Sequence, residues 1–332
     1  MQLGPYRLPN PVFVAPMAGV TDRPYRRLCR RLGAGYAVSE MAASNPRLWA
    51  TVKTSRRIDH AGEPGPVAVQ LAGADPQMMA EAARFNVDRG AQVIDINMGC
   101  PAKKVCNVAA GSALMGDETL ALRIVQAVAA AVDVPVTVKM RTGIDRTRRN
   151  AASLARSMQD AGAALITVHG RSRACAFQGE AEYDTIAKVK QALRIPVVAN
   201  GDIDTPAKAA WVMARTGADA VMIGRAGQGN PWLYRQVAHF LACGELLPAP
   251  SLNEIRQVLR EHLEDHYAFH GPVMGPRVAR KHIGWYVGHW GDRSGGNARA
   301  LLAAVNQAED PEQQLRLLDE FLCASEDEIA VH

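Results

Sequence analysis

The sequence predicts an α/β fold, a (β/α)8 TIM barrel followed by a small C-terminal all-helical domain. Short runs rich in β-type residues recur eight times within the first 224 of the 332 residues, and a helix-like stretch follows each run. Beyond residue 245, helical periodicity continues without further strand-like runs. Strands that alternate with helices form parallel sheets with crossover helices, and eight such units in roughly 230 residues are typical of a barrel.

The strand-like runs begin alternately after a Pro-Val pair and a Gly-Ala pair. Glycine is common just past a helix end, and proline stops a helix and can start a strand. An open doubly wound sheet is the alternative, but it would carry an early Gly-rich dinucleotide loop, and no G-x-G-x-x-G follows the first run. The expected strands are VFVAPM from Val12, YAVSE from Tyr36, VAVQLA from Val67, VIDINM from Val93, VTVKMR from Val136, LITVHG from Leu165, VVANGD from Val197 and AVMIG from Ala220.

The barrel pattern ends in a proline-containing link, Glu245 to Pro250. Ser251 and Glu254 then form a capping-box start, in which the two side chains satisfy free N–H groups of the first helical turn. Helical periodicity covers 251–270, 276–290, 297–307 and 311–324. We therefore expect a barrel domain over residues 1–245 and a helical domain over residues 251–332.

Composition and the N-terminus exclude several classes of protein. Apolar residues make up 48% and charged residues 21% of the chain, an ordinary globular balance. There is no apolar run of about 18 residues and no signal-peptide pattern, so we expect a cytoplasmic protein without membrane association. The six cysteines have no C-x-x-C or zinc spacing, which predicts reduced thiols and no metal site.

Polar side chains at the ends of five expected strands predict the position of a site. Side chains alternate between the barrel interior and the helix layer, so Thr137, Lys139 and Arg141 are expected to point inward. A buried ammonium is costly unless it meets an anion, which favours a functional Lys139. The same alternation directs inward a set of polar residues near the catalytic face, namely Gln70, Asp95, Asn97, Thr167, His169 and Asn200.

Two loops have the composition of a phosphate site. The seventh expected strand ends in Asn200-Gly201-Asp202, and the eighth is followed by Gly224-Arg225. Barrel enzymes commonly bind phosphate at these two loops through backbone N–H groups, and an arginine adds a fork of donors. A phosphate there and Lys139 deeper in the barrel together predict a phosphorylated cofactor across the barrel mouth.

Cys100 lies in the Asn97-Met-Gly-Cys-Pro101 segment, directly after the fourth expected strand. Most free cysteines are inert, but this one lies on the catalytic face. A thiol is mostly protonated at neutral pH, so it could act as a proton donor or as a nucleophile. Cys106 and Cys175 lie on the same face, and we interpret both as inert.

Basic residues are concentrated in the barrel part of the chain. Residues 1–250 hold 30 basic and 20 acidic side chains, whereas residues 251–332 hold 8 and 13. Loops after three neighbouring strands are expected to form a basic collar, which is either a solvated surface or a nucleic-acid site. Its members are Lys103, Lys104, Arg141, Arg146, Arg148, Arg149, Arg171 and Arg173. The helical part has a second basic cluster, Arg277, Arg280, Lys281 and His282, beside Trp285 and Tyr286, whose rings we interpret as core.

Several motifs together resemble the tRNA-dihydrouridine synthase family, and its bacterial subtype B most closely. The resemblance covers essentially the whole chain. The motifs are Pro16-Met-Ala-Gly-Val-Thr-Asp22, Gln70-Leu-Ala-Gly73, Asp95-Ile-Asn-Met-Gly-Cys-Pro-Ala-Lys-Lys104, Gly111-Ser-Ala-Leu114, Lys139-Met-Arg-Thr-Gly143, His169-Gly-Arg171, Asn200-Gly-Asp202, Ile223-Gly-Arg225 and Ala279-Arg-Lys-His282.

The resemblance implies an enzyme that reduces a D-loop uridine of tRNA to 5,6-dihydrouridine with FMN and NADPH (or NADH). It implies Cys100 as proton donor to C5 and Asn97 as the residue that holds the target base. The implied flavin contacts are Pro16, Met17, Ala18, Gln70, Lys139, His169, Asn200, Gly201, Asp202, Gly224 and Arg225. The tRNA contacts expected from the basic loops and the tail are Lys104, Arg141, Arg146, Arg148, Arg149, Arg171, Arg173, Arg277, Arg280 and Lys281.

Subtype B further implies uridine 17 as the target. We expect a monomer that needs no protein partner. A small-molecule flavin oxidoreductase on the same barrel, acting on a free pyrimidine or an enone, is the main alternative. It would leave the basic loops and the helical domain without a role. A non-catalytic RNA-binding protein is a further alternative, and the presence of Cys100 and Lys139 argues against it.

Overall fold

The computed structural model describes residues 1–294 and 297–329, and each of the expected strand-like runs contains a strand. The parallel strands are Val12–Val14 (β3), Tyr36–Ala37 (β4), Ala42–Ala43 (β5), Ala68–Ala72 (β6), Val93–Met98 (β7), Val136–Arg141 (β8), Ala163–His169 (β9), Val197–Asn200 (β10) and Ala220–Ile223 (β11). They form one sheet in the order β4-β3-β11-β10-β9-β8-β7-β6-β5.

The sheet closes on itself between β4 and β6. Val38 forms a parallel bridge with Ala68, and the backbone N–H of Ser39 donates to the Ala68 carbonyl at 3.1 Å. The short strand β5 pairs with β6 beside this junction. This closure confirms the predicted (β/α)8 barrel over an open doubly wound sheet, in which the edge strands would stay apart.

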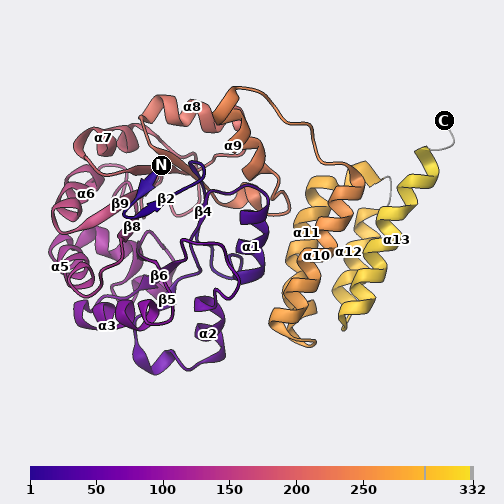
Figure 1. The fold of residues 1–332 in the computed structure, drawn as a ribbon, viewed down its shortest axis with the longest axis horizontal. Helices are drawn as coiled ribbons and strands as arrows, with labels where there is room; N and C mark the ends of the chain where they lie inside the picture. Colours follow the sequence, from indigo (N-terminus) through magenta and orange to yellow (C-terminus); the bar gives the residue numbers. More distant parts are fainter. Residues whose placement is uncertain (295–296, 330–332) are drawn as a thin grey trace. The chain divides into compact units, whose positions relative to one another are not determined.

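Helices follow the strands and surround them (Figure 1). The longer ones are α1 (Arg23–Arg31), α3 (Pro76–Val87), α5 (Glu118–Ala129), α6 (Ala151–Asp160), α7 (Asp184–Ala192), α8 (Pro206–Thr216) and α9 (Leu233–Cys243). Shorter elements lie in the loops, namely η1 (Pro46–Leu48), α2 (Val52–Ile58), α4 (Lys103–Cys106), η2 (Gly111–Gly116) and η3 (Arg225–Gly227).

Local sequence explains where these helices begin and end. The side chains of Asp75 and Thr205 each accept the backbone N–H three residues further on, and a proline follows each cap. Proline suits the first helical turn because it has no N–H to satisfy there. Gly217 ends α8 in the left-handed conformation with φ of 68°, which glycine adopts without steric cost.

An antiparallel hairpin of β1 (Gln2–Leu3) and β2 (Tyr6–Arg7) precedes the barrel and was not predicted. Its Leu3 side chain and the following Leu8 are buried in one cluster with residues that begin several strands, including Val93 and Ala220. The cluster therefore fills the end of the barrel opposite the carboxyl ends of the strands. Two-residue strands carry too little alternation to be recognised in a sequence.

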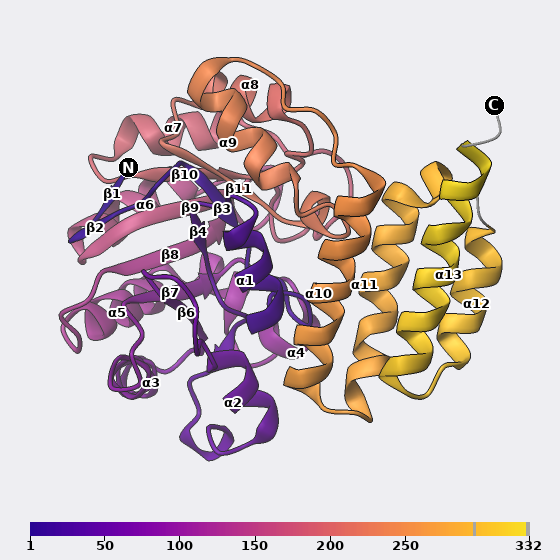
Figure 2. The same ribbon diagram turned by 45° about the vertical axis from the view of Figure 1, so that its right-hand side comes forward.

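The C-terminal part is helical, as predicted, over α10 (Leu252–His270), α11 (Met274–Trp290), η4 (Gly291–Ser294), α12 (Ala298–Gln307) and α13 (Pro311–Ile329). The Ser251 hydroxyl accepts the Glu254 N–H at 3.1 Å, which confirms the expected cap at the start of α10. The longer helices lie side by side (Figure 2). In their core, the Tyr267 hydroxyl donates to Gln314 at 2.9 Å.

The chain forms two compact units. One comprises Met1–Gly224 and Tyr234–Glu245, and the other comprises Arg225–Leu233 and Leu246–His332. The segment Arg225–Leu233 belongs with the helices because the Trp232 ring lies 5.5 Å from that of Trp290. None of the helices within the described ranges has the length and apolarity that a membrane crossing requires.

Candidate active site

A chain of hydrogen-bonded polar side chains begins inside the barrel and reaches the loop after β7. Asp95 lies at its inner end and accepts hydrogen bonds from Thr137 Oγ1 at 2.6 Å and from Gln70 Nε2 at 2.7 Å. Gln70 Oε1 in turn accepts from Asn97 Nδ2 at 2.7 Å. The strand registers pair Asp95 with Gln70 and with Thr137, as expected from the predicted inward alternation.

Asn97 links this chain to the loop that carries Cys100. Its Oδ1 accepts the backbone N–H groups of Gly99 at 3.2 Å and of Cys100 at 3.0 Å. The backbone N–H of Ser112 donates to the Cys100 carbonyl at 3.0 Å, which fixes the other side of the loop. The half-buried Cys100 thiol is thus carried by a loop that is hydrogen-bonded on both sides at the carboxyl end of β7.

Lys139 lies on the neighbouring strand and is paired in register with Asn97. Its Nζ donates to Asn200 Oδ1 at 2.9 Å, and Asn200 Nδ2 donates to the Met222 carbonyl at 2.8 Å. The polar ends of β8 and β10 therefore meet within the barrel, as the sequence predicts. The hydrogen-bond acceptor that the structure gives the Lys139 ammonium is thus a neutral amide.

Burial shifts the pKa values of both charged groups in the barrel. Burial lowers the pKa of Lys139 to about 8, and the nearby Arg141 cation lowers it further, whereas Asp95 acts against the shift. Burial also raises the pKa of Asp95 to about 6, against the hydrogen bonds from Thr137 and Gln70. At neutral pH the barrel interior therefore holds an ammonium and a carboxylate.

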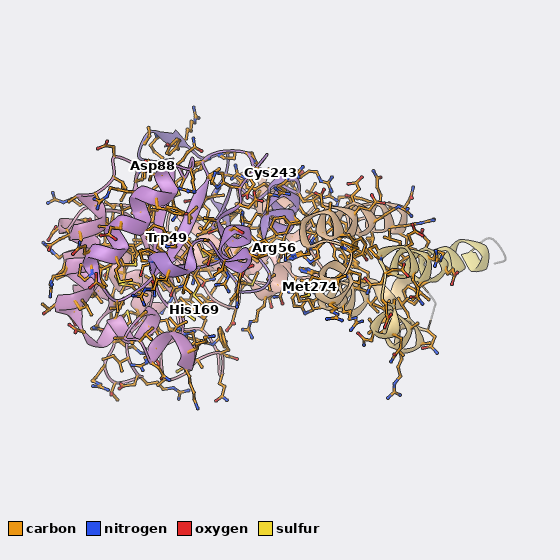
Figure 3. All side chains as sticks on the ribbon, turned by 90° about the horizontal axis from the view of Figure 1, so that it is seen from below. Trp49, Arg56, Asp88, His169, Cys243 and Met274 are labelled. Carbon is orange, nitrogen blue, oxygen red and sulfur yellow. The ribbon has the colours of Figure 1, made fainter. Side chains whose placement is uncertain are left out.

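Asn200-Gly201-Asp202 forms a tight turn after β10. Gly201 has φ of +125°, and a Cβ there would lie 2.8 Å from Ala181 Cβ and 3.0 Å from the His169 ring. The loop therefore leaves a backbone segment without a side chain beside His169, which Figure 3 labels in the barrel part of the molecule. Asp202 accepts two hydrogen bonds from the Arg171 guanidinium, at 2.8 and 2.7 Å.

The loops after β3 and β11 lie next to each other. A Cβ on Gly224 would lie 3.6 Å from both Ala15 Cβ and Met17 Sδ. Pro16 and Met17 are half-buried and Ala18 is exposed, so this part of the mouth has an apolar wall. Arg225 follows Gly224 directly in the chain, begins η3 and is exposed.

Two members of the expected basic collar are buried rather than exposed. Arg141 is 1% exposed and Arg171 is 4% exposed. The Arg171 guanidinium pairs with Asp202 and also donates to the carbonyls of Gln178 and Gly179. The alternation of side chains in β8 predicted that Arg141 points inward, and its burial agrees with that prediction. The burial of Arg171 could not be predicted, because an arginine in a loop is normally solvated and this one finds its partners only through the fold.

The other collar members lie on the surface of the barrel unit. Lys103, Lys104, Arg146, Arg148 and Arg149 are exposed, and Arg173 is half-buried. Arg148 pairs with Asp145 at 2.8 Å and Arg149 with Glu182 at 3.5 Å. Exposed ion pairs of this kind contribute little free energy, so a phosphate could compete for these arginines.

A pocket of about 390 Å³ lies between the loops after β8 and β9. Its lining residues are Asp145, Arg146, Thr147, Ala174, Cys175 and Gln178. A hydrogen bond from Ser172 lowers the pKa of the Cys175 thiol, and Arg146 adds to this effect. Phe177, also on the loop after β9, is 58% exposed.

In the helical unit, the second basic cluster lies on α11. Arg277 is exposed, whereas Arg280 is half-buried and donates to the Ala308 carbonyl at 3.1 Å. Lys281 is half-buried and His282 is buried. The Tyr286 ring lies 6.1 Å from that of Trp232, which confirms its interpretation as a core residue.

Sequence reasoning missed Glu40 and the role of Asp95. The buried Glu40 carboxylate accepts the Gly19 N–H at 2.7 Å and so fixes the loop after β3. The signal was present, because Glu40 is the polar residue near the carboxyl end of the second strand-like run, as Gln70 is in the third. Asp95 was expected inside the barrel, but its place at the inner end of the Gln70–Asn97 chain depends on three strands meeting.

The closed barrel, with a thiol, an ammonium and oriented amides at the carboxyl ends of its strands, defines an enzyme of the (β/α)8 class. A model of the family described as dihydrouridine synthase (Dus) matches residues 13–326. The chain therefore belongs to the dihydrouridine synthase family, whose members are oxidoreductases that act on tRNA uridines.

Curated relatives cover nearly the whole chain. A "tRNA-dihydrouridine synthase B" of Xanthomonas axonopodis pv. citri is 59% identical over 324 residues, covering 98% of this chain and 96% of its own. The protein of the same name from Pseudomonas aeruginosa is 54% identical over 321 residues, covering 97% of this chain and 95% of its own. These findings agree with the family resemblance seen in the motifs.

Solved structures share the barrel fold at low sequence identity. A 2-naphthoyl-CoA reductase in complex with 2-naphthoyl-CoA has a TM-score of 0.56 and 13% identity, covering 72% of this chain and 51% of its own. Histamine dehydrogenase from Rhizobium sp. 4-9 has a TM-score of 0.54 and 13% identity, covering 80% of this chain and 50% of its own. At this identity they show the fold alone.

Proposed function

We propose that this protein reduces a D-loop uridine of tRNA to 5,6-dihydrouridine, with FMN as cofactor and NADPH (or NADH) as reductant. The observation that carries the proposal is the Cys100 loop, which Asn97 holds at the barrel mouth beside the strand that carries Lys139. The names of the curated relatives support the substrate. The flavin and the proton donor rest on the site itself and on the family resemblance.

The residues at the barrel mouth fit FMN. Lys139 is a buried cation whose hydrogen-bond acceptor is a neutral amide, which suits an anionic ring system. Gly201 leaves room where a Cβ would fill the turn, so its backbone can approach a phosphate. We assign the phosphate to Asn200, Gly201, Asp202, Gly224 and Arg225. We propose that the flavin ring is contacted by Pro16, Met17, Ala18, Gln70, Lys139 and His169.

The proposed reaction needs a hydride at uracil C6 and a proton at C5. When bound, reduced FMN would supply the hydride from N5. Lys139 would stabilise the negative charge of the reduced ring, because a fixed cation in a water-poor site acts without reorganisation. Cys100 would transfer its thiol proton to C5 as a general acid and is left as a thiolate, which solvent reprotonates before the next cycle.

The target uridine must leave its stack to reach a barrel mouth. We propose that Asn97 holds the base and that cations on both units hold the tRNA backbone, mainly through shape and phosphate contacts. The exposed or half-buried candidates are Lys104, Arg146, Arg148, Arg149, Arg173, Arg277, Arg280 and Lys281. Arg141 and Arg171, expected among them, are buried, and we propose that they hold loops at the barrel mouth instead of contacting tRNA directly.

We further propose uridine 17 as the target, because the chain resembles subtype B, and the cytoplasm as the site of action, because tRNA is modified there. The residues 1–245 would carry the flavin and residues 251–332 would contribute tRNA contacts.

The test of the function uses tRNA from a strain that lacks dihydrouridine. We expect the purified protein and NADPH to add two hydrogens to one D-loop fragment, measured by mass spectrometry of nuclease digests. The position of the heavier fragment would also test uridine 17. A yellow protein that oxidises NADPH without changing tRNA would contradict the proposal and favour a small-molecule flavin reductase.

The exposed arginines of the loop after β8 give a separate prediction. Replacing Arg146, Arg148 and Arg149 with alanine is expected to weaken tRNA binding and to flatten its salt dependence by about 2–3 in the slope of log K against log salt. The reason is that fewer counterions are released when fewer phosphates are neutralised. Binding titrations at several salt concentrations would measure this, and an unchanged slope would make the loop a solvated surface only.

A further inference from the structure

Arg141 occupies an unusual position for an arginine. It ends β8, and its side chain is 1% exposed among loops at the carboxyl ends of the strands. Its Nε donates to the Gly99 carbonyl at 2.6 Å, and its Nη1 donates to the carbonyls of Ser172 at 2.9 Å and Ala176 at 2.7 Å. A single planar guanidinium thus contacts two different loops.

Among the residues that the structure describes, the hydrogen-bond acceptors of Arg141 are the backbone carbonyls of Gly99, Ser172 and Ala176. Arg171, the other buried arginine of the mouth, pairs instead with the carboxylate of Asp202. Burial lowers the pKa of Arg141 to about 10, and the group therefore remains a cation at neutral pH. Burying a cation whose acceptors are neutral carbonyls costs free energy, so the position of Arg141 points to a role for the geometry that its hydrogen bonds impose.

One of the two loops carries Cys100. Gly99, whose carbonyl Arg141 binds, is the residue before Cys100, and its N–H is held by Asn97. The side chain of Arg141 therefore fixes the carbonyl side of the peptide group that precedes the thiol. Asn97 and Arg141 approach this segment from adjacent strands.

The other loop follows β9 and includes the exposed Phe177. It is already paired with the loop after β8, since the backbone N–H groups of Arg173 and Ala174 donate to the carbonyls of Gly143 and Ile144 at 2.9 Å. Arg141 adds the connection from this pair of loops to the segment before Cys100. Beyond the pairing of the strands themselves, the Arg141 side chain thus bonds directly to both the segment before Cys100 and the loop after β9.

We propose that Arg141 is a positioning residue that clamps the Cys100 loop to the loop after β9 and so sets the place of the thiol. This inference rests on the proposed function in so far as Cys100 is the proton donor. It differs from the sequence-based expectation that Arg141 contacts tRNA. A rigid fork suits this role because guanidinium donors lie in one plane with fixed directions, which an ammonium cannot reproduce.

The test compares Arg141→Met and Arg141→Lys with the parent protein in the presence of flavin. We expect turnover on dihydrouridine-free tRNA to fall about 100-fold in Arg141→Met, because a displacement near 1 Å can cost this much. We expect the dissociation constant for tRNA to change less than about threefold, because the side chain is buried. Arg141→Lys keeps the charge but not the fork, and it should lie closer to Arg141→Met than to the parent.

Hydrogen exchange gives a readout that does not depend on activity. In Arg141→Met, peptides that cover 98–107 and 170–179 should lose protection together, whereas peptides from α3 and β6 should not change. Arg156→Met, a change on the exposed face of α6, is the matched control and should leave both the exchange and the turnover unchanged.

Chemical rescue separates a positioning role from a general loss of folding. In Arg141→Ala, guanidinium ion at sub-denaturing concentration should restore part of both turnover and protection, and equal concentrations of sodium chloride or urea should not. Loss of tRNA affinity in proportion to turnover would overturn the proposal in favour of direct tRNA contact. Exchange that changes in only one of the two loops would overturn it as well. If the parent protein fails to reduce tRNA, the proposed function fails. Hydrogen exchange in the Arg141 variants, and its recovery with guanidinium, would still test whether Arg141 holds the two loops together.

Discussion

Cys100→Ala is expected to lower the reduction of tRNA uridine by about 10³-fold, the middle of the range for loss of a general acid. Flavin content and tRNA affinity should be unchanged, because Asn97 holds this loop through backbone N–H groups that alanine retains. The measurements are dihydrouridine formation by mass spectrometry, flavin absorbance and a tRNA binding titration.

Cys243→Ala is the matched control, since this thiol is exposed on α9 and labelled in Figure 3 away from His169. It should retain parental turnover. Undiminished turnover in Cys100→Ala would show that Cys100 is not the general acid, while the reduction of tRNA uridine itself would still stand.

Lys139→Met is expected to reduce turnover by about 10²–10³-fold, the range for loss of one preorganised charge or donor in an active site. Methionine fills a similar volume without the ammonium, so Asn200 loses its donor and the reduced ring loses its cation. Stopped-flow absorbance would measure flavin reduction by NADPH, and mass spectrometry would measure product. Lys188→Met, on the exposed face of α7, is the control. Normal flavin reduction and turnover in Lys139→Met would contradict the assignment.

The same lysine predicts a pH dependence. Burial lowers the Lys139 pKa to about 8, so the side chain is charged below that pH and neutral above it. Turnover should therefore fall as the pH rises through about 8, while the protein stays folded by circular dichroism. A rate that stays level from pH 7 to well above the Lys139 pKa would contradict a role for this charge.

The alternation of side chains in β8 shows why much of the barrel could be predicted. In this run of six residues the apolar side chains at 136, 138 and 140 all point to one face of the sheet, towards the helices. Thr137 and Lys139 must then point to the opposite face, into the barrel. The same rule placed Asn200 inside the barrel, where it accepts a hydrogen bond from Lys139. Ser251 likewise predicted the start of α10, because a helix cap and the N–H group that it binds lie within a few residues of each other in the sequence.

The parts that sequence reasoning missed depend on contacts between distant segments. Arg171 was expected on the surface, and only the assembled loops supply the carbonyls and the carboxylate that bury it. Arg141 was expected to point inward, but its carbonyl partners on two loops could not be predicted. The Asp95–Gln70–Asn97 chain joins side chains of two strands, β6 and β7, so its members could be placed inside the barrel but their hydrogen bonds could not be predicted. The assignment of Arg225–Leu233 to the helical unit depends in the same way on Trp232 and Trp290.

That last grouping has a consequence for dissecting the protein into fragments. The chain passes between the units at Gly224–Arg225, at Leu233–Tyr234 and again at Glu245–Leu246. If the chain were cut after Glu245, Trp232 would remain in the barrel fragment. The rings that it contacts, Tyr286 and Trp290, would be in the other fragment. Both fragments would expose aromatic surface and be prone to aggregate. A transplant of the helical unit between relatives would have to carry two pieces of sequence, the nine-residue insert as well as the tail.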